Sequence, residues 1–447
     1  MDPRETTLTT MVTAAGCRAE MGARTDRGVR QDGPMVDTAV EALRASCRRS
    51  VGGHGVLTAA DLLALIPQDT AMDVYGSGGV VEELEGEVAA LLGKPAAIFL
   101  PSGTMAQQAV LRVHADRRGP RTVLFHPTCH LDEHEGRGYE RLHDLVGRPV
   151  GDRQRLITLA DLESVAEPFA VLLIELPQRE IGGSQPVWDE LVAQTGWARS
   201  RGAAVHLDGA RLWESAAGYG VPPAEVADLF DTAYVSFYKG LGGITGCCVV
   251  GEPDVVAELR EWRQRHGGTL YALWPYAAAA LTALRQRLPL MARYLEHARD
   301  IATLLREVPG VTVRPDPPQV PMMHLLLRAS AGTLTSNIRR VAEQQGIWTW
   351  PAPMATTDRG SRPSSCRSGT QPSSSAQTRC ATSSRRCWRT SRHDVVHPVP
   401  LPRQCRPTPA CRLLAGSSRL AWDARGARRG RARAAGPAVR RTASRPT

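Results

Sequence analysis

The segment Thr232 to Gly246 (TAYVSFYKGLGGITG) constrains the fold and chemistry of this chain more than any other stretch. Its β-branched and aromatic residues predict a buried strand, and its glycines predict a turn where backbone passes close to a ligand. Lys239 lies between the two, and only one other lysine, Lys94, occurs among 55 basic residues. A desolvated lysine amine can bond to an aldehyde, which arginine cannot do, so Lys239 is a candidate for covalent chemistry. A solvated lysine after a strand is the plainer interpretation.

Continuous apolar runs elsewhere predict further strands of one sheet. They lie at 96–100, 123–125, 171–176 and 203–207, with helices expected at 80–92, 188–201 and 254–265 between or after them. Strands without alternation are typical of a parallel sheet covered on both faces. The chain is therefore expected to be α/β with a mainly parallel sheet. One long helix at 276–306 and strands at 311–313 and 322–327 then predict a smaller α+β domain.

Four stretches of different character are expected along the chain. Residues 1–70 form an N-terminal arm, with 1–34 interpreted as disordered and Thr58 as the cap of a helix at 58–66. Residues 71–275 are expected to form the large domain, and residues 276–355 a truncated small domain that lacks its last strand and helix. Residues 356–447 form a basic low-complexity tail.

The composition of that tail departs from the rest of the chain. It contains 20 arginines, no lysine, three aspartates and no glutamate, a net charge of +17, which leaves −7 for residues 1–355. A frameshift in a GC-rich gene explains this composition better than a functional basic tail does, because a shifted frame can encode the strand and helix that an α+β domain would end with. On this interpretation no nucleic-acid partner is expected.

Polar residues at strand ends supply candidates for a binding site. Ser102, Gly103 and Thr104 precede a predicted helix, where free backbone N–H groups suit a phosphate, although a simple helix cap is the plainer interpretation. Asp208 and Arg211 follow the strand at 203–207, where open α/β sheets place ligand contacts, although a local ion pair would also explain them. His130 lies in a loop after another strand. It is spaced four residues from His126 and from His134, but Pro127 argues against one metal-binding helix, and a single histidine lying flat on a cofactor ring is expected instead.

Four motifs in order then point to a family. DVYG at 73–76, LPSGTM at 100–105, HLDGARLW at 206–213 and SFYKGLGG at 236–243 resemble those of the threonine aldolase and aromatic amino acid β-eliminating lyase family. This resemblance covers about residues 73–350. It implies the fold of the aspartate aminotransferase type (fold type I), pyridoxal 5'-phosphate as the cofactor, and a homo-oligomeric lyase acting on a small amino acid.

The resemblance also implies roles for the candidate residues. Lys239 would hold the cofactor as a Schiff base and then act as the base, and Asp208 would pair with the pyridine nitrogen. His130 would stack on the ring, and Arg211 would face the substrate carboxylate or orient the cofactor. The phosphate would be held by the turn at 102–104, with Ser236 as a further ligand.

Several alternatives stay open. The reaction is either cleavage of a Cα–Cβ bond or β-elimination, and transamination on the same fold is the nearest rival. An inactive frameshifted copy and a nucleic-acid-binding protein with a basic tail are the others. The sequence contains no run of eighteen apolar residues and no signal-peptide core, so a cytoplasmic protein is expected, with no membrane partner. The ten cysteines form no CxxC pair and favour neither a zinc site nor a disulfide framework.

Overall fold

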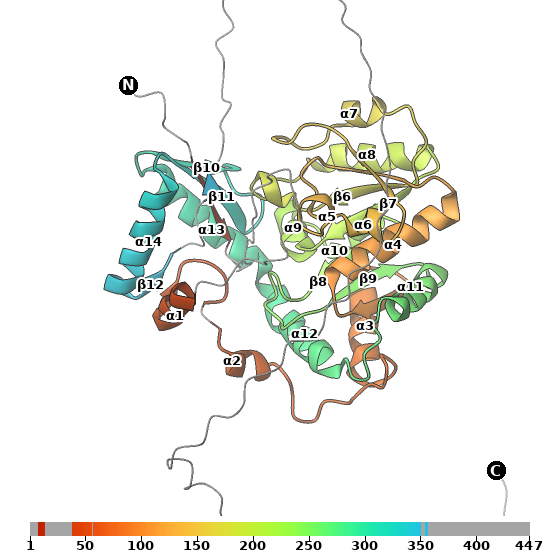
Figure 1. Cartoon of the computed structure of the whole chain (residues 1–447), viewed down its shortest axis with the longest axis horizontal. Coiled ribbons are helices and arrows are strands. Elements are labelled where there is room, and N and C mark those ends of the chain that lie inside the picture. Colours follow the sequence, from red (N-terminus) through yellow and green to blue (C-terminus); the bar gives the residue numbers. More distant parts are fainter. Residues whose placement is uncertain (1–7, 14–37, 56, 350–353, 356–447) are drawn as a thin grey trace, which may run out of the picture. The chain divides into compact units, whose positions relative to one another are not determined.

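The computed structural model describes residues 8–13, 38–55, 57–349 and 354–355, and the predictions made for the tail lie outside these ranges. Its main feature is a seven-stranded sheet with the strand order β3-β9-β8-β7-β6-β4-β5 (Figure 1). The strands are β3 (Ala96–Leu100), β4 (Thr122–Phe125), β5 (Val146–Pro149), β6 (Val171–Glu175), β7 (Ala204–Gly209), β8 (Thr232–Ser236) and β9 (Cys247–Gly251). Strands β5, β4, β6, β7 and β8 pair in parallel, and β9 is antiparallel to β3 and β8. The mainly parallel α/β sheet expected from the sequence is confirmed.

Helices cover the sheet and explain why its strands are apolar on both sides. They are α3 (Gly79–Leu91), α4 (Gly103–Arg118), α5 (His130–Glu133), α6 (Gly138–Arg141), α7 (Leu159–Glu163), α8 (Trp188–Ser200), α9 (Leu212–Tyr219), α10 (Pro223–Asp228), α11 (Pro253–Arg265) and α12 (Trp274–Arg287). Alternate residues of β6 join different hydrophobic clusters, with Leu172 and Ile174 in one and Val171 and Leu173 in the other. Each face of the sheet therefore packs its own core, as continuous apolar strands predict.

The expected helix at 276–306 is wrong as a single element. The structure has α12, a 3₁₀ turn at Leu288–Leu290, and then α13 (Met291–Arg306). Pro289 lies in that turn. Proline has no N–H to donate and its ring crowds the preceding turn of a helix, so the continuous helix is interrupted there.

A second sheet has the order β10-β11-β1-β13, from β10 (Val311–Arg314), β11 (Met322–Leu327), β1 (Leu8–Thr13) and β13 (Met354–Ala355). Strands β10 and β11 were expected from the sequence. The interpretation of residues 1–34 as disordered is wrong for residues 8–13, because β1 pairs antiparallel with β11 along its whole length. This pairing joins residues far apart in the sequence, so local periodicity does not reveal it.

The N-terminal arm and the end of the small domain also meet. The arm contains α1 (Thr38–Ser46), β2 (Arg49–Ser50) and α2 (Ala59–Leu63), and β2 pairs in parallel with β12 (Ile347–Trp348), which follows α14 (Ala331–Gln345). The predicted cap of α2 is confirmed, since the Thr58 side chain accepts from the Asp61 N–H and Asp61 bonds back to the Thr58 backbone. Among the helices that the structure describes, none combines the length and the hydrophobicity that a membrane span requires.

The topology of the large sheet determines where ligands can bind. From β4 the chain continues to β5 on one side, and β6 then lies on the other side of β4. Open α/β sheets bind ligands in the crevice that such a reversal leaves at the carboxyl ends of the strands. His126, Glu175 and Asp208 all lie at or just after the carboxyl ends of β4, β6 and β7, so the sheet brings them to one edge.

Candidate active site

Lys239 lies in a tight, buried turn directly after β8. Its side chain is 9% exposed, and the N–H of Gly242, whose φ is 63°, donates to the Lys239 carbonyl at 3.0 Å. The next residue, Gly240, bonds through its carbonyl to Nε2 of His54 from the N-terminal arm, at 2.8 Å. The glycines therefore permit a compact turn in which the lysine is buried.

Asp208, near the carboxyl end of β7, is a buried acid that interacts with the charge of Lys239. It is 7% exposed, and its Oδ1 accepts a hydrogen bond from the Ala210 N–H at 3.1 Å. Burial raises the pKa of Asp208, while the positive charges of Lys239 and His130 act to lower it. The aspartate expected to meet a pyridine nitrogen, the lysine and the histidine thus share one electrostatic environment.

Glu175 was not selected from the sequence, although it was the only polar residue in its apolar run. It lies opposite Asp208 in the parallel pairing of β6 with β7, and its Oε1 accepts from the backbone N–H of His130 at 2.6 Å. Burial, and then the charge of Asp208, raise the pKa of Glu175 to about 8. At neutral pH this glutamate is mostly protonated beside an acid that is expected to be ionised.

His130 begins α5 and its ring is accessible, with 35% of the side chain exposed. Its Nδ1 bonds to Oε1 of Glu135 at 3.0 Å, an interaction that fixes the ring. His134 lies against it with ring centroids 4.9 Å apart, whereas His126 turns away and bonds through Nε2 to the Arg155 carbonyl at 2.8 Å. The described residues contain no group of three or more histidine, cysteine, aspartate or glutamate side chains arranged for a metal ion.

The turn at 102–104 forms the N-terminus of α4, as expected. The Ser102 hydroxyl caps the helix by accepting from the Met105 N–H at 3.5 Å, and the side chain of Thr104 is exposed. A Cβ on Gly103 would lie 2.3 Å from the Tyr234 hydroxyl, so this position requires glycine. Unpaired N–H groups in the first turn of a 16-residue helix suit a phosphate.

Arg211 has buried donors without a partner among the described residues, whereas the Ser236 hydroxyl is already hydrogen-bonded within the protein. Arg211 is 4% exposed, and neither Nε nor Nη2 finds a hydrogen-bond partner in the described part of the structure. Buried guanidinium groups are normally satisfied, so these unused donors indicate an anionic ligand. The Ser236 hydroxyl instead donates to the Ala210 carbonyl at 2.8 Å. Its proton is used there, and its phosphate role stays a prediction.

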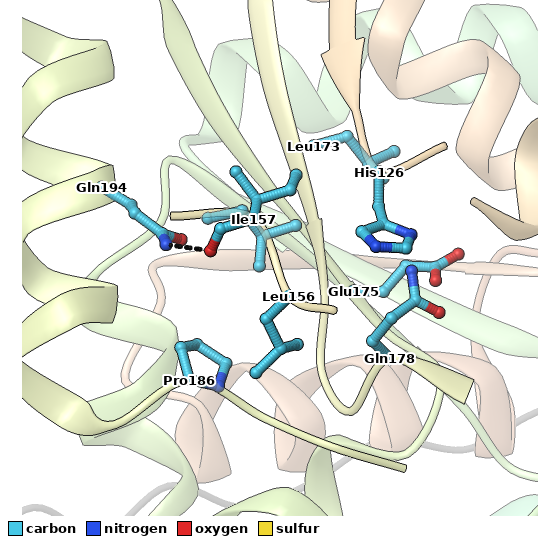
Figure 2. Close-up of a pocket in the computed structure, with 9 residues that line it drawn as sticks. His126, Leu156, Ile157, Leu173, Glu175, Gln178, Pro186 and Gln194 are labelled. Carbon is cyan, nitrogen blue, oxygen red and sulfur yellow. Dashed lines mark hydrogen bonds between the residues drawn. The ribbon is translucent and has the colours of Figure 1, made fainter. Parts of the chain in front are cut away.

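A small cavity of about 30 Å³ lies beside Glu175, between the carboxyl ends of β4 and β6 (Figure 2). Its walls are mostly apolar, and Glu175 and Gln178 extend toward the His126 ring in the same view. Oε2 of Glu175 and Nε2 of Gln178 are both buried without a hydrogen-bond partner among the described residues. Sequence reasoning missed this cavity, and the position of Gln178 just after a predicted strand was the one available signal. The lining residues are His126, Leu156, Ile157, Leu173, Ile174, Glu175, Gln178, Pro186 and Gln194.

These groups fit pyridoxal 5'-phosphate. A helix N-terminus is available for its phosphate, a buried amine for its aldehyde, a buried carboxylate for its ring nitrogen, and an accessible imidazole for its ring face. The unused Nε and Nη2 donors of Arg211 match the two oxygens of a carboxylate. Fold and site together define a pyridoxal-phosphate-dependent enzyme of fold type I.

Comparison with known proteins identifies the family. The model of the beta-eliminating lyase family matches residues 59–327, and the chain belongs to this family. A crystal structure from an Exiguobacterium species, provisionally described as an aromatic amino acid beta-eliminating lyase/threonine aldolase, is 36% identical, with a TM-score of 0.68 over 71% of this chain and 93% of that one. A Listeria monocytogenes structure provisionally described as an L-allo-threonine aldolase is also 36% identical, with a TM-score of 0.67 over 71% of this chain and 92% of that one.

Curated relatives agree with these structures. Low-specificity L-threonine aldolase 1 of Arabidopsis thaliana is 27% identical over 62% of this chain and 79% of its own length. Aldolase vrtJ of Penicillium aethiopicum is 34% identical over 58% of this chain and 68% of its own length. The family, the fold, the lyase class and the cofactor expected from the sequence are confirmed. The roles of individual residues, the domain boundaries and the substrate stay predictions.

Proposed function

We propose that this enzyme cleaves the Cα–Cβ bond of a small β-hydroxy amino acid in the manner of a threonine aldolase, with Lys239 as the residue that carries the cofactor. The observation that supports this proposal most is the convergence of Lys239, Asp208 and His130 in one electrostatic environment at the carboxyl edge of the sheet. The names of the aldolase relatives favour aldol cleavage over β-elimination.

Each residue has a distinct task in this proposal. When bound, pyridoxal phosphate supplies a ring that accepts the electron pair of the bond being broken. Asp208 keeps a proton on the ring nitrogen, because an ionised carboxylate in a buried site stabilises a positive charge strongly. His130 would lie against the ring face, with its orientation fixed by the hydrogen bond between its Nδ1 and Glu135. Lys239 Nζ would hold the cofactor; after the substrate amine has taken its place, the freed amine would accept the β-hydroxyl proton as the Cα–Cβ bond breaks and return a proton to Cα of the glycine that forms.

Two further contacts orient the substrate. Arg211 binds its carboxylate through the unused Nε and Nη2 donors, a bidentate contact that also excludes water. The cavity beside Glu175 accommodates the side chain beyond Cβ. Its apolar walls, with only the Gln178 amide and a largely protonated Glu175 as free polar groups, favour an uncharged side chain that carries an oxygen acceptor.

We also propose that the chain forms a homo-oligomer. Apolar side chains are exposed together where DVYG meets the segment before α12, with Met72 and Tyr271 each 69%, Tyr75 56% and Val74 55% exposed. The Tyr75 N–H donates to the Tyr271 carbonyl at 2.9 Å, which joins the two segments. Such a surface favours association with a second copy. Sedimentation of the purified protein tests this, and a monomer at micromolar concentration would contradict it.

The test of the catalytic proposal combines spectroscopy with product analysis. Purified protein loaded with pyridoxal phosphate should show a visible absorbance band that Lys239→Ala lacks, and reduction with borohydride should fix the cofactor on the peptide that contains Lys239. Lys94→Ala is the matched control and should keep the band. Aldol cleavage releases glycine and an aldehyde, β-elimination releases a 2-keto acid and ammonia, and transamination requires an added keto acid. Keto-acid formation without glycine would reject the aldolase proposal and keep the cofactor assignment.

A further inference from the structure

Glu214 is a buried carboxylate at the start of α9 that none of the roles above uses. It is 2% exposed, and neither Oε1 nor Oε2 has a hydrogen-bond partner on any other residue that the structure describes. A Cβ placed on Gly240 would lie only 1.9 Å from Oε1. The carboxylate therefore lies directly against the backbone of the residue that follows Lys239.

The charges around Glu214 come from two elements. Burial raises the pKa of Glu214, whereas the charges of Arg211, three residues earlier, and of Lys239, the residue before Gly240, lower it, as does a hydrogen bond from the backbone N–H of Glu214 itself. Asp208 from β7 also interacts with the charges of Lys239 and of His130 from α5. His54 from the N-terminal arm bonds to the Gly240 carbonyl. The unpaired donors of Arg211 do not bond to Glu214, so acid and guanidinium are near one another without forming an ion pair.

The helix N-terminus accounts for part of the stabilisation of Glu214, because acidic side chains are favoured in the first turn of a helix. An apolar residue of similar size would avoid the cost of burying a carboxylate at this position. Glu214 lies in the first turn of α9, and its own backbone N–H helps to lower its pKa, but neither carboxylate oxygen has a hydrogen-bond partner on any other described residue. The close approach to Gly240 places its charge where it acts on the lysine.

We propose that Glu214 sets the protonation of Lys239 and so serves as a positioning residue for the amine. When Glu214 is ionised it favours the ammonium form of Lys239, and when it takes up a proton it favours the neutral, nucleophilic amine. Asp208 cannot replace it once its charge is committed to a bound ring nitrogen. Only this last consequence depends on the proposed function; the coupling between Glu214 and Lys239 belongs to the polypeptide itself.

The composition of the chain provides a direct test, because Lys94 and Lys239 are its only lysines. In cofactor-free protein, acetic anhydride acylates each lysine in proportion to its neutral fraction, and peptide mass spectrometry measures both sites across a pH series. Glu214→Gln should lower the pH midpoint of Lys239 labelling by about one unit, the effect of removing a nearby opposite charge. Lys94, whose Nζ donates to the Phe230 carbonyl, is the internal reference and should not shift.

Three further variants make the result specific. Ser215→Ala changes the adjacent buried residue without changing charge and should leave the midpoint of Lys239 at the wild-type value. Glu214→Asp retains a carboxylate, so its Lys239 midpoint should lie between those of the wild type and of Glu214→Gln. Glu214→Met makes the same prediction as Glu214→Gln and provides the test if the glutamine variant does not fold. An unchanged Lys239 midpoint in a folded, uncharged Glu214 variant would overturn the proposal, as would an equal shift of Lys94. Because no cofactor or substrate is present, failure here is distinct from failure of the aldolase proposal.

Discussion

Glu175 and Asp208 face each other across adjacent parallel strands, at the last residue of β6 and the fifth residue of β7. Both are buried, and burial raises the pKa of each of them. Two neighbouring buried carboxylates repel each other when both are ionised, which costs free energy. Glu175 therefore keeps its proton, and Asp208 carries the negative charge that interacts with Lys239 and His130. The backbone N–H of His130 bonds to Glu175, which ties α5 to the same pair.

The pH dependence of stability should reveal the proton on Glu175. Its pKa is raised from an ordinary value of 4.5 to about 8, so between these values the folded chain holds a proton that the unfolded chain has released. The free energy of unfolding should therefore fall as pH rises through this window, by up to about 1.4 kcal/mol per pH unit for one proton. Glu175→Gln should remove this contribution. Urea unfolding across the window measures it, and equal pH slopes in wild type and variant would refute the assignment.

Replacing Asp208 should separate cofactor chemistry from folding. We expect Asp208→Asn to fold, because the amide keeps the size of the carboxyl, but to lower kcat by roughly two to three orders of magnitude through loss of electrostatic stabilisation. The absorbance of the bound cofactor should also change its pH dependence. Unaltered kcat in Asp208→Asn would show that another residue meets the ring nitrogen.

Gly103→Ala should damage the phosphate turn through one identifiable contact. The added Cβ would lie 2.3 Å from the Tyr234 hydroxyl, so we expect a destabilisation of about 1–3 kcal/mol and weaker cofactor binding. Removing that hydroxyl with Tyr234→Phe should recover part of the loss. Thermal unfolding and cofactor titration of the single and double variants measure the coupling, and strictly additive effects would contradict it.

Filling the cavity beside Glu175 should change substrate preference. Leu156 is a half-buried lining residue, and Leu156→Trp should lower kcat/KM for amino acids with bulky side chains by about 10-fold or more, with a smaller effect on threonine. The exposed Leu142 provides a matched control, since Leu142→Trp adds the same bulk outside the cavity. Equal losses on all substrates would mean that the cavity does not receive the side chain.

The sequence by itself determined the elements and their chemistry. Continuous apolar runs identified β6, β7 and β8 as strands buried on both faces, because such strands have no polar face to present to water. The candidate site was identified from residues at strand ends, Lys239 and Asp208, and from the helix cap at Ser102. Such features can be found in the sequence because glycine turns and helix caps depend on local residue type.

Only the tertiary structure decided which of these groups act on one another. The pairing of Glu175 with Asp208 follows from the register between two strands, and the contact of Glu214 with Gly240 follows from the packing of α9 on the turn after β8. The pairing of β1 with β11 likewise joins the start of the chain to its small domain. Periodicity reports the burial of a segment but not its partner, and the pKa of a buried acid depends on the charges that long-range pairing brings near it.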